Sequence, residues 1–329
     1  MFDLDPDEPA LAFAPEAEAL PELHVLLAAP RGFCAGVRRA IEAVEDALAI
    51  HGAPVFVRRP IVHNLAVVRT LEAKGAVFVQ ELDEVPEGAV VILSAHGVAP
   101  AVAREAEARG LVVFDAVCPL VAKVHREVER HHRSGRHVLL VGHDGHPEIV
   151  GTLGHVPEGA ATLVRTAEDV AALTIGSDAP VGLAVQTTYS VDEAADVVGA
   201  LAARFPSLVQ PPASDICYAT TNRQAAVRAI AARADAVIVA GESFSSNACR
   251  LAEVAEAAGC QSVQLVADVE ELDWARLAGR GSIGITAAAS TPEETVAAIM
   301  AALRGRYSVR IEEVVAAEET IMFKRVAVQ

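Results

Sequence analysis

Three of the five cysteines in this 329-residue chain stand in similar surroundings. Cys34, Cys118 and Cys217 each follow an apolar segment and precede a helical pattern, and domain-sized intervals separate them. A turn at the start of a helix favours a thiolate, because unpaired N–H groups and the helix dipole stabilise negative charge there. Three thiolates that converge would bind a metal group, although any single cysteine of this kind is more often a small buried hydrophobic residue.

The number of cysteines narrows the kind of metal group. Structural zinc normally takes four ligands, often in CxxC pairs, and the sequence contains no CxxC pair. An iron–sulfur cube held by three cysteines instead leaves one iron free to bind a substrate. Cys249 and Cys260 lie outside the pattern, and we expect Cys260 to be buried and inert.

A second group of polar residues lies where other apolar segments end. Histidine N–H, hydroxyl and amide groups beside helix N-termini form a pocket suited to an anion. Glu148 is the expected proton donor, because burial next to a bound anion raises the pKa of a carboxyl group. The sequence has no Walker loop, and a nucleotide cradle is not supported. The expected pocket residues are His63, His96, His146, Gln186, Thr187, Thr188, Ser245, Ser246, Asn247 and Ser290.

These residues need a scaffold that brings several strand ends together. Short β-branched segments such as 137–145 and 236–243 alternate with longer amphipathic, alanine-rich segments, which is typical of βαβ units with parallel sheets. Ligands bind at the carboxyl ends of the strands in such sheets. Because the layout around each cysteine recurs, we expect an α/β protein of three similar lobes, with mostly parallel sheets, in a pseudo-threefold arrangement around the three cysteines and any metal group that they hold.

The expected lobes cover residues 24–113, 114–211 and 212–305, and each contains one of the three cysteines. Residues 306–329 are expected to form a short terminal strand pair that packs on the edge of one sheet. Residues 1–23 contain many carboxylates and no lysine or arginine, and we expect them to form a disordered acidic extension.

Charge and composition exclude several functions. The chain has 44 acidic and 27 basic residues, a formal net charge of −17, which disfavours nucleic-acid binding and adhesion to anionic membranes. The N-terminus lacks the basic start of a signal peptide and the arginines of a transit peptide, and no uncharged apolar run reaches the ~18 residues of a membrane span. The low, odd number of cysteines argues against a disulfide scaffold, and we predict a cytoplasmic protein.

Several motifs together resemble one enzyme family. RGFCAGVRRAIE, SAHGV, DAVCPLVAKVH, GHDGHPEIVGT and DICYATTNRQ stand in the order found in 4-hydroxy-3-methylbut-2-enyl diphosphate reductases. The resemblance covers about residues 24–305, and FCAGVRRAI and HPEIVGT are highly specific strings. It implies the last step of the methylerythritol phosphate route to isoprenoids, in which an allylic alcohol diphosphate is reductively dehydroxylated to isopentenyl and dimethylallyl diphosphates. It also implies three α/β lobes around a 4Fe–4S cluster.

The resemblance further implies roles for individual residues. Thr187 would position the substrate hydroxyl, and Glu148 would deliver protons. The open iron of the cluster would take that hydroxyl. A separate ferredoxin or flavodoxin would supply two electrons, since the sequence offers no flavin or nicotinamide fold of its own. Carried over by motif, the cluster ligands are Cys34, Cys118 and Cys217, and the diphosphate-binding residues are His63, His96, His146, Ser245, Asn247 and Ser290.

The third lobe departs from the family pattern at three positions. Phe244 stands where asparagine is usual, Ala248 where a polar residue is common, and Ala288 where glycine is usual. These departures leave open a paralogue with an altered allylic diphosphate substrate. A non-catalytic iron–sulfur redox sensor would explain the cysteines but not the anion pocket or Glu148. A cysteine or serine hydrolase would need a nucleophile beside a base, and no such pair is evident.

Five arginines lie close to the first cysteine loop or to the next strand end. We hypothesise that they meet an acidic electron donor despite the net negative charge of the chain. Ordinary solvated arginines explain the same pattern at least as well. The five are Arg31, Arg38, Arg39, Arg58 and Arg59.

Overall fold

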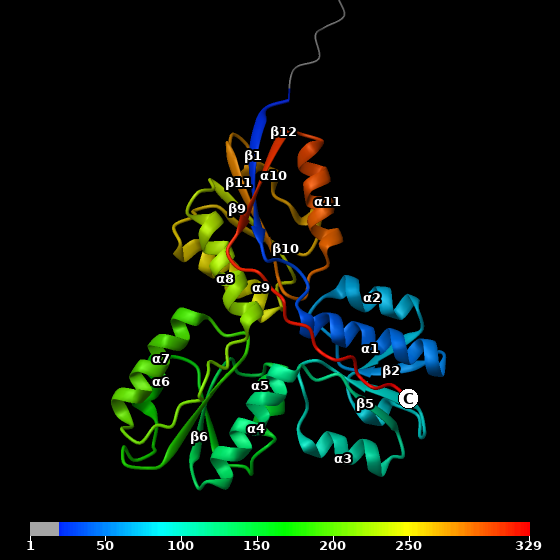
Figure 1. Cartoon of the computed structure of the whole chain (residues 1–329), viewed down its shortest axis with the longest axis vertical. Coiled ribbons are helices and arrows are strands. Elements are labelled where there is room, and N and C mark those ends of the chain that lie inside the picture. Colours follow the sequence, from blue (N-terminus) through cyan, green and yellow to red (C-terminus); the bar gives the residue numbers. More distant parts are fainter. Residues whose placement is uncertain (1–19) are drawn as a thin grey trace, which may run out of the picture.

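The computed structural model describes residues 20–329, which form three α/β lobes arranged around a common centre (Figure 1). Each lobe has its own sheet, and every strand pair in the three sheets is parallel. The predicted α/β architecture of three lobes with parallel sheets is therefore confirmed. Most of the extension expected at residues 1–23 lies outside the described residues.

The sheet of the third lobe has five strands and is covered on both faces. Leu23, Val25 and Ile285 point to one side of it, and Leu26 and Val239 to the other. Its order is β10 (Val263–Val266), β9 (Ala236–Ala240), β11 (Ser282–Ala287), β1 (Glu22–Ala29) and β12 (Ser308–Val315). The covering elements are α8 (Tyr218–Ala231) and α9 (Ser246–Ala257) on one face, with η2 (Val269–Glu271), α10 (Trp274–Leu277) and α11 (Glu293–Arg304) on the other.

The first and second lobes have smaller sheets. In the first, the order is β3 (Ala76–Val79), β2 (Val55–Arg58), β4 (Val90–Leu93) and β5 (Val112–Asp115), with α1 (Ala35–His51), α2 (Leu65–Ala73), η1 (Leu82–Glu84) and α3 (Pro100–Ala108). In the second, the order is β7 (Ala161–Val164), β6 (His137–Val141) and β8 (Val181–Val185), with α4 (Pro119–Arg133), α5 (Pro147–Leu153), α6 (Ala167–Ala172) and α7 (Val191–Arg204).

Strand β1 corrects the expected start of the first lobe. Residues 24–29 were expected to lie in that lobe, but β1 pairs with β11 and β12 of the third lobe. The physical reason is burial on both faces, because Val25 packs with the α11 side of the sheet and Leu26 with the α8 side. As an inner strand of the five-stranded sheet, β1 is covered on both sides.

Each of the three cysteines consequently lies where the chain passes from one lobe to another. Cys34 follows β1 of the third lobe and precedes α1, which packs on β2 and β4 of the first. Cys118 follows β5 of the first lobe and precedes α4, which packs on β6 and β8 of the second. Cys217 follows a segment whose Val209 bridges to the second lobe, and it precedes α8, which packs on β1 and β11 of the third.

The C-terminal segment also crosses between lobes. The expected strand pair at 306–329 is wrong in part, because β12 is its single strand, on the edge of the five-stranded sheet. The chain then runs from the third lobe to the first (Figure 1). Arg39 on α1 donates to the carbonyl of Lys324 at 2.9 Å, and Val328 is buried in the core of the first lobe. The segment 316–329, called here the strap, ties the two lobes together.

We predict that Val328→Ala lowers the free energy of unfolding by about 1–2 kcal/mol, because it removes two buried carbon groups from the core of the first lobe. Thermal or urea unfolding measures the change. Met322→Ala in the same strap is the control, since the side chain of Met322 is 90% exposed and its loss should leave stability unchanged. Equal stability of both variants would show that the strap is not anchored by Val328.

Candidate functional site

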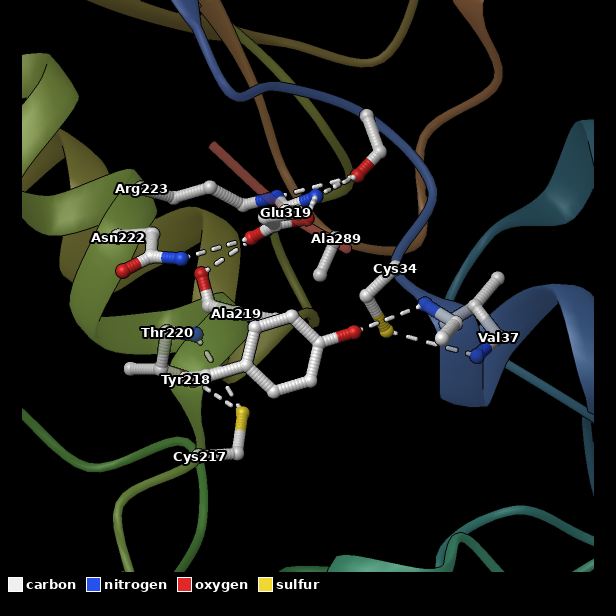
Figure 2. Close-up of polar contacts among 12 residues, drawn as sticks. Cys34, Val37, Cys217, Tyr218, Ala219, Thr220, Asn222, Arg223, Ala289 and Glu319 are labelled. Carbon is white, nitrogen blue, oxygen red and sulfur yellow. Dashed lines mark hydrogen bonds and ion pairs between the residues drawn. The ribbon is translucent and has the colours of Figure 1, made fainter. Parts of the chain in front are cut away.

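The thiols of Cys34, Cys118 and Cys217 open onto one central pocket of about 110 Å³. Each cysteine is the N-cap residue of a helix, of α1, α4 and α8 respectively. The Cys34 sulfur accepts from the Val37 N–H at 3.5 Å, and the Cys217 sulfur accepts from the Thr220 N–H at 3.4 Å (Figure 2). The structure thus brings together the three cysteines that the sequence singles out.

Gly36 allows two of these thiols to stand close together. A Cβ atom at this position would lie 2.8 Å from the Cys118 sulfur and 3.8 Å from the Cys34 sulfur. The backbone of Gly36 is helical, so its role is to leave space and not to adopt a special conformation. The glycine of the CAG sequence therefore keeps the space between the two sulfurs open.

Burial works against the ionisation of two of these thiols. It raises the pKa of Cys118 to about 12 and that of Cys217 to about 11, and repulsion from the Cys34 sulfur adds to both shifts. The sequence argument that a helix N-terminus favours a thiolate is outweighed here by desolvation. Within residues 20–329, no three His, Cys, Asp or Glu side chains are placed to hold a single metal ion. The thiols surround a space, and a cationic group larger than one ion would fit them.

Three histidine rings form the opposite wall of the pocket. The ring centroids of His63 and His96 are 4.1 Å apart, and His146 lies 5.4 and 6.0 Å from them. Gly97 has a φ of +75° and approaches His125 so closely that a Cβ would lie 2.4 Å from that ring. This turn, which other residues adopt with strain, directs His96 into the pocket.

Burial keeps these histidines neutral at pH 7. It lowers the pKa of His63 to about 4 and that of His146 to about 3, and it lowers the pKa of His96 well below its usual value. The Nδ1 atom of His146 accepts from the Glu148 N–H at 3.2 Å, so its proton is on Nε2. That Nε2 and the Nε2 of His63 are buried without a partner in the structure. They are available to an acceptor in the pocket.

The third lobe adds hydroxyl and amide groups to this wall. The Ser290 hydroxyl donates to the carbonyl of His63 at 3.0 Å. The Oδ1 atom of Asn247 accepts from the Ala289 N–H at 2.9 Å, which leaves its buried Nδ2 without a partner. Ser245 caps α9. Unpartnered donors from three loops and neighbouring helix N-termini therefore face one small cavity, an arrangement that suits an anion with several oxygens.

Glu148 lies behind the pocket wall and is fully buried. Its two oxygens accept from the N–H and the hydroxyl of Thr187, both at 2.7 Å. Burial raises the pKa of Glu148 to about 7, and the negative charge of Asp215 raises it further against the opposing effect of Thr187. The carboxyl group is therefore poised to exchange a proton near neutral pH, as the sequence argument expected.

Two of the predicted pocket residues do not line the cavity. Glu148 reaches it through Thr187, and Gln186 lies behind it, where it accepts from the His143 N–H and donates to the Thr188 hydroxyl, both at 2.8 Å. The other predicted residues line the cavity, namely the three cysteines with His63, His96, His146, Thr187, Thr188, Ser245, Ser246, Asn247 and Ser290. Gln186 is better described as a residue that positions the Thr188 loop.

Sequence reasoning missed a buried arginine that ties two cysteine loops together. Arg223 donates to the carbonyl of Gly32, two residues before Cys34, at 2.7 and 3.1 Å. It also pairs with Glu319 of the strap at 2.8 Å (Figure 2). Asp215 is a second missed residue, since it accepts from the Val185 N–H and pairs with Lys123 behind the Glu148 loop. Neither pattern has a local sequence signal, because each partner is distant in the chain.

The three departures in the third lobe leave the donors of the pocket in place. Phe244 is 47% exposed and meets the His63 ring edge-on at the pocket rim. Ala248 and Ala288 are fully buried, and both lie against Gly241, where a Cβ would come within 2.7 and 3.1 Å of their methyl groups. The two alanines therefore pack together beneath the Ser245 loop and do not enter the cavity.

Comparisons with known proteins agree with this geometry. A family model described as LytB protein matches residues 25–304. The chain belongs to the LytB family. A protein of Methylocella silvestris named 4-hydroxy-3-methylbut-2-enyl diphosphate reductase is 55% identical over 92% of this chain and 95% of its own length. One of the same name from Gluconobacter oxydans is 54% identical over 95% of both.

Solved structures of two such reductases share the fold. The enzyme of Plasmodium falciparum superposes with a TM-score of 0.88 and 36% identity, over 93% of this chain and 96% of that one. A second reductase, described as the terminal enzyme of the non-mevalonate pathway, has a TM-score of 0.62 and 32% identity, over 86% and 99%. No helix within residues 20–329 is long and apolar enough to cross a bilayer.

We predict that Glu148→Gln stabilises the fold at alkaline pH. The pKa of Glu148 is about 7 in the folded chain and 4.5 by default in the unfolded chain. The contribution of this carboxyl group to the free energy of unfolding is therefore complete below pH 4.5 and is lost as pH rises through 7. The amide has no such loss, and its gain over the native chain should grow between pH 5 and pH 8, to roughly 3 kcal/mol at most. Thermal unfolding across this range measures it; a gain that does not change with pH would contradict the raised pKa.

Proposed function

We propose that this chain reduces 4-hydroxy-3-methylbut-2-enyl diphosphate. The reaction breaks the allylic C–O bond with two electrons and two protons, releases water, and forms isopentenyl and dimethylallyl diphosphates. The observation that carries the proposal is the shared cavity, in which three thiols meet unpartnered donors for an anion, with a carboxyl group of pKa about 7 directly behind the Thr187 wall. The names of the relatives and solved structures support it.

Cys34, Cys118 and Cys217 would hold a 4Fe–4S cluster. The donor set fits, because three thiols face one cavity and burial opposes the ionisation of Cys118 and Cys217, so that a cationic group is needed for them to become thiolates together. When bound, such a cluster supplies one-electron transfers and Lewis-acid character. Three ligands, with no fourth cysteine among the lining residues, are what the proposed chemistry requires.

The diphosphate would bind to neutral donors. The buried Nε2 atoms of His63 and His146 and the Nδ2 atom of Asn247 have no partner among residues 20–329, and the N-termini of α2 and α9 lie beside them. Because the free rings are neutral, binding of a multiply charged anion should raise their pKa values and draw protons into the pocket. The site thereby gains positive charge only when substrate is present.

Thr187 and Glu148 would handle the hydroxyl end of the substrate. Thr187 lines the cavity, and its own hydroxyl donates to the Glu148 carboxylate at 2.7 Å. When Glu148 is protonated, the pair can pass a proton from the buried carboxyl group through the threonine hydroxyl to the departing oxygen.

The residues of the pocket also bear on the two alternative functions, a reductase of an altered substrate and a redox sensor. The unchanged pocket donors favour the named substrate over an altered allylic diphosphate, since Phe244 stands at the rim. A non-catalytic redox sensor would have no use for the unpartnered donors or for Glu148. The electron donor, a ferredoxin or flavodoxin, and the cytoplasmic location stay predictions from the sequence.

Anaerobic turnover tests the proposed function. The chain is purified without oxygen, its iron and sulfide are measured, and it is supplied with the hydroxylated diphosphate and dithionite-reduced viologen. Formation of both isoprenyl diphosphates, with one molecule of substrate consumed for two electrons, is the expected result. A brown protein that leaves the substrate intact would instead favour the sensor.

We predict that Cys118→Ser and Gly36→Ala both reduce cluster loading, the first by removing a ligand and the second by pushing a methyl group against the Cys118 sulfur. Iron and sulfide per chain after anaerobic reconstitution measure the loss. Gly199→Ala on α7 is the control, because a Cβ there meets nothing within 4 Å. Full loading of Cys118→Ser would refute the ligand assignment.

We predict that Glu148→Gln lowers turnover by ~10²–10⁴, the usual contribution of a positioned acid. Iron content and the KM for substrate should change little, since Glu148 lies behind the cavity. The rate of the unchanged enzyme should fall as pH rises above about 7, where the acid form disappears. A variant that keeps both its rate and its pH profile would remove Glu148 from the mechanism.

A further inference from the structure

A second hollow, of about 420 Å³, lies on the other side of the first cysteine loop. Ala35 and Tyr218, the residues that follow Cys34 and Cys217, form part of its lining, and the Ala35 N–H donates to the Tyr218 hydroxyl at 3.2 Å (Figure 2). The strap forms another wall, with Ile321, Met322 and Phe323. This hollow therefore comes close to two of the three thiols from outside the central pocket.

Four arginines and two glutamates line the hollow, which gives it a net positive charge in a strongly acidic chain. Arg38 is exposed, and its guanidinium lies 5.9 Å from the centroid of the Phe33 ring and has no ion pair or hydrogen bond within residues 20–329. Within the same residues, the side chain of Arg39 donates only to the carbonyls of Val117 and Lys324. Arg31 is paired with Glu293 and Glu313. Arg58 and Arg59 both pair with Glu81 and do not line the hollow. Of the five arginines near the first cysteine, Arg38 and Arg39 thus keep their charge for a partner.

Apolar side chains stand beside these charges. Met322 is 90% exposed, Ile321 is 44% exposed, and Phe323 lines the hollow with them. The strap that carries them is fixed at both ends, by Glu319 on Arg223 and by Val328 in the core of the first lobe. An apolar centre with unpaired cations around it is the pattern of a surface that binds an acidic protein.

The hollow and the substrate pocket do not compete for space. The two share no lining residue, because Gly36 and Val37 face the central pocket, whereas Ala35, Arg38 and Arg39 face the hollow. A third hollow, lined by His63, His146 and Phe244, opens next to the central pocket and leaves the substrate an entrance of its own. A protein seated over Arg38 would therefore not block substrate entry.

We propose that the hollow between Arg38, Tyr218 and Met322 is the docking surface for a small acidic electron-transfer protein. The proposal rests on the proposed function, which needs two electrons from outside the chain for each substrate. The partner would lay acidic side chains against Arg38, Arg39 and Lys324 and an apolar patch against Met322. Two successive one-electron transfers, each oxidising one reduced partner, would balance the reduction of one substrate molecule.

Charge reversal tests the surface. Arg38→Glu and Met322→Asp are compared with Arg104→Glu, in which an exposed arginine of α3 outside the hollow is reversed. The probe is a reduced acidic 2Fe–2S ferredoxin. Its affinity for the cluster-loaded chain is measured by calorimetry at low and high salt, and turnover is measured with ferredoxin and, separately, with reduced viologen as donor.

We expect both hollow variants to weaken ferredoxin binding and ferredoxin-driven turnover about tenfold or more at low salt, with viologen-driven turnover within about twofold of the native chain. Added salt should shrink the difference, and Arg104→Glu should behave as the native chain does. Unchanged ferredoxin affinity in both hollow variants would overturn the docking surface, as would an equal loss with viologen. Failure of the native chain to turn over with viologen would count against the proposed function, while the affinities would still decide the surface.

Discussion

The central constraint on this fold is that helices from all three lobes begin at one cavity. α1, α4 and α8 begin at Cys34, Cys118 and Cys217, and α2 and α9 begin beside the histidines and serines of the opposite wall. Every helix presents unpaired N–H groups at its start, and these favour anions. A negatively charged group at the centre would therefore be stabilised by helix starts from all three lobes. Under the proposed function, thiolates on one side and a diphosphate on the other would supply this charge.

Burial and the helix N-termini have opposite effects on the protonation of this site, because burial disfavours the anions that the helix N-termini would stabilise. Burial holds Cys118 and Cys217 protonated, His63 and His146 neutral, and Glu148 half protonated near pH 7. The empty cavity is thus close to uncharged. Charge enters the cavity with the groups that bind there. The free-energy cost of desolvating these groups is reduced, because each new anion meets donors that are already oriented.

Much of the site could be predicted from the sequence because its signals are local. Adjacent residues determine both the turn and helix pattern around each cysteine and the polar ends of the strands. Nearly all of the predicted residues line the cavity. The partner of β1 could not be predicted in this way. Its apolar segment suits either neighbouring sheet, and only the packing of Val25 and Leu26 on opposite faces selects the third lobe.

The contacts that escaped prediction share a long separation in the chain. The sequence around Arg223 is that of an ordinary helical arginine. Its partners are far away in the chain, since Gly32 lies almost two hundred residues from it and Glu319 almost one hundred. The position of Gln186 at the end of a strand, beside Thr187, predicts that it lines the pocket. The direction of its side chain depends on His143, whose N–H it accepts. Hydrogen bonds between distant loops are decided by the assembled fold.

The position of the cysteines at the three crossings between lobes has a mechanical consequence. A cofactor held by Cys34, Cys118 and Cys217 would be a three-way cross-link, and every lobe would be joined to it through the segment by which the chain enters or leaves that lobe. Loss of the cofactor would release three hinges at once. Arg223 would then act as a second link, because its hydrogen bonds to the Gly32 carbonyl join the crossings at Cys217 and Cys34 through protein alone.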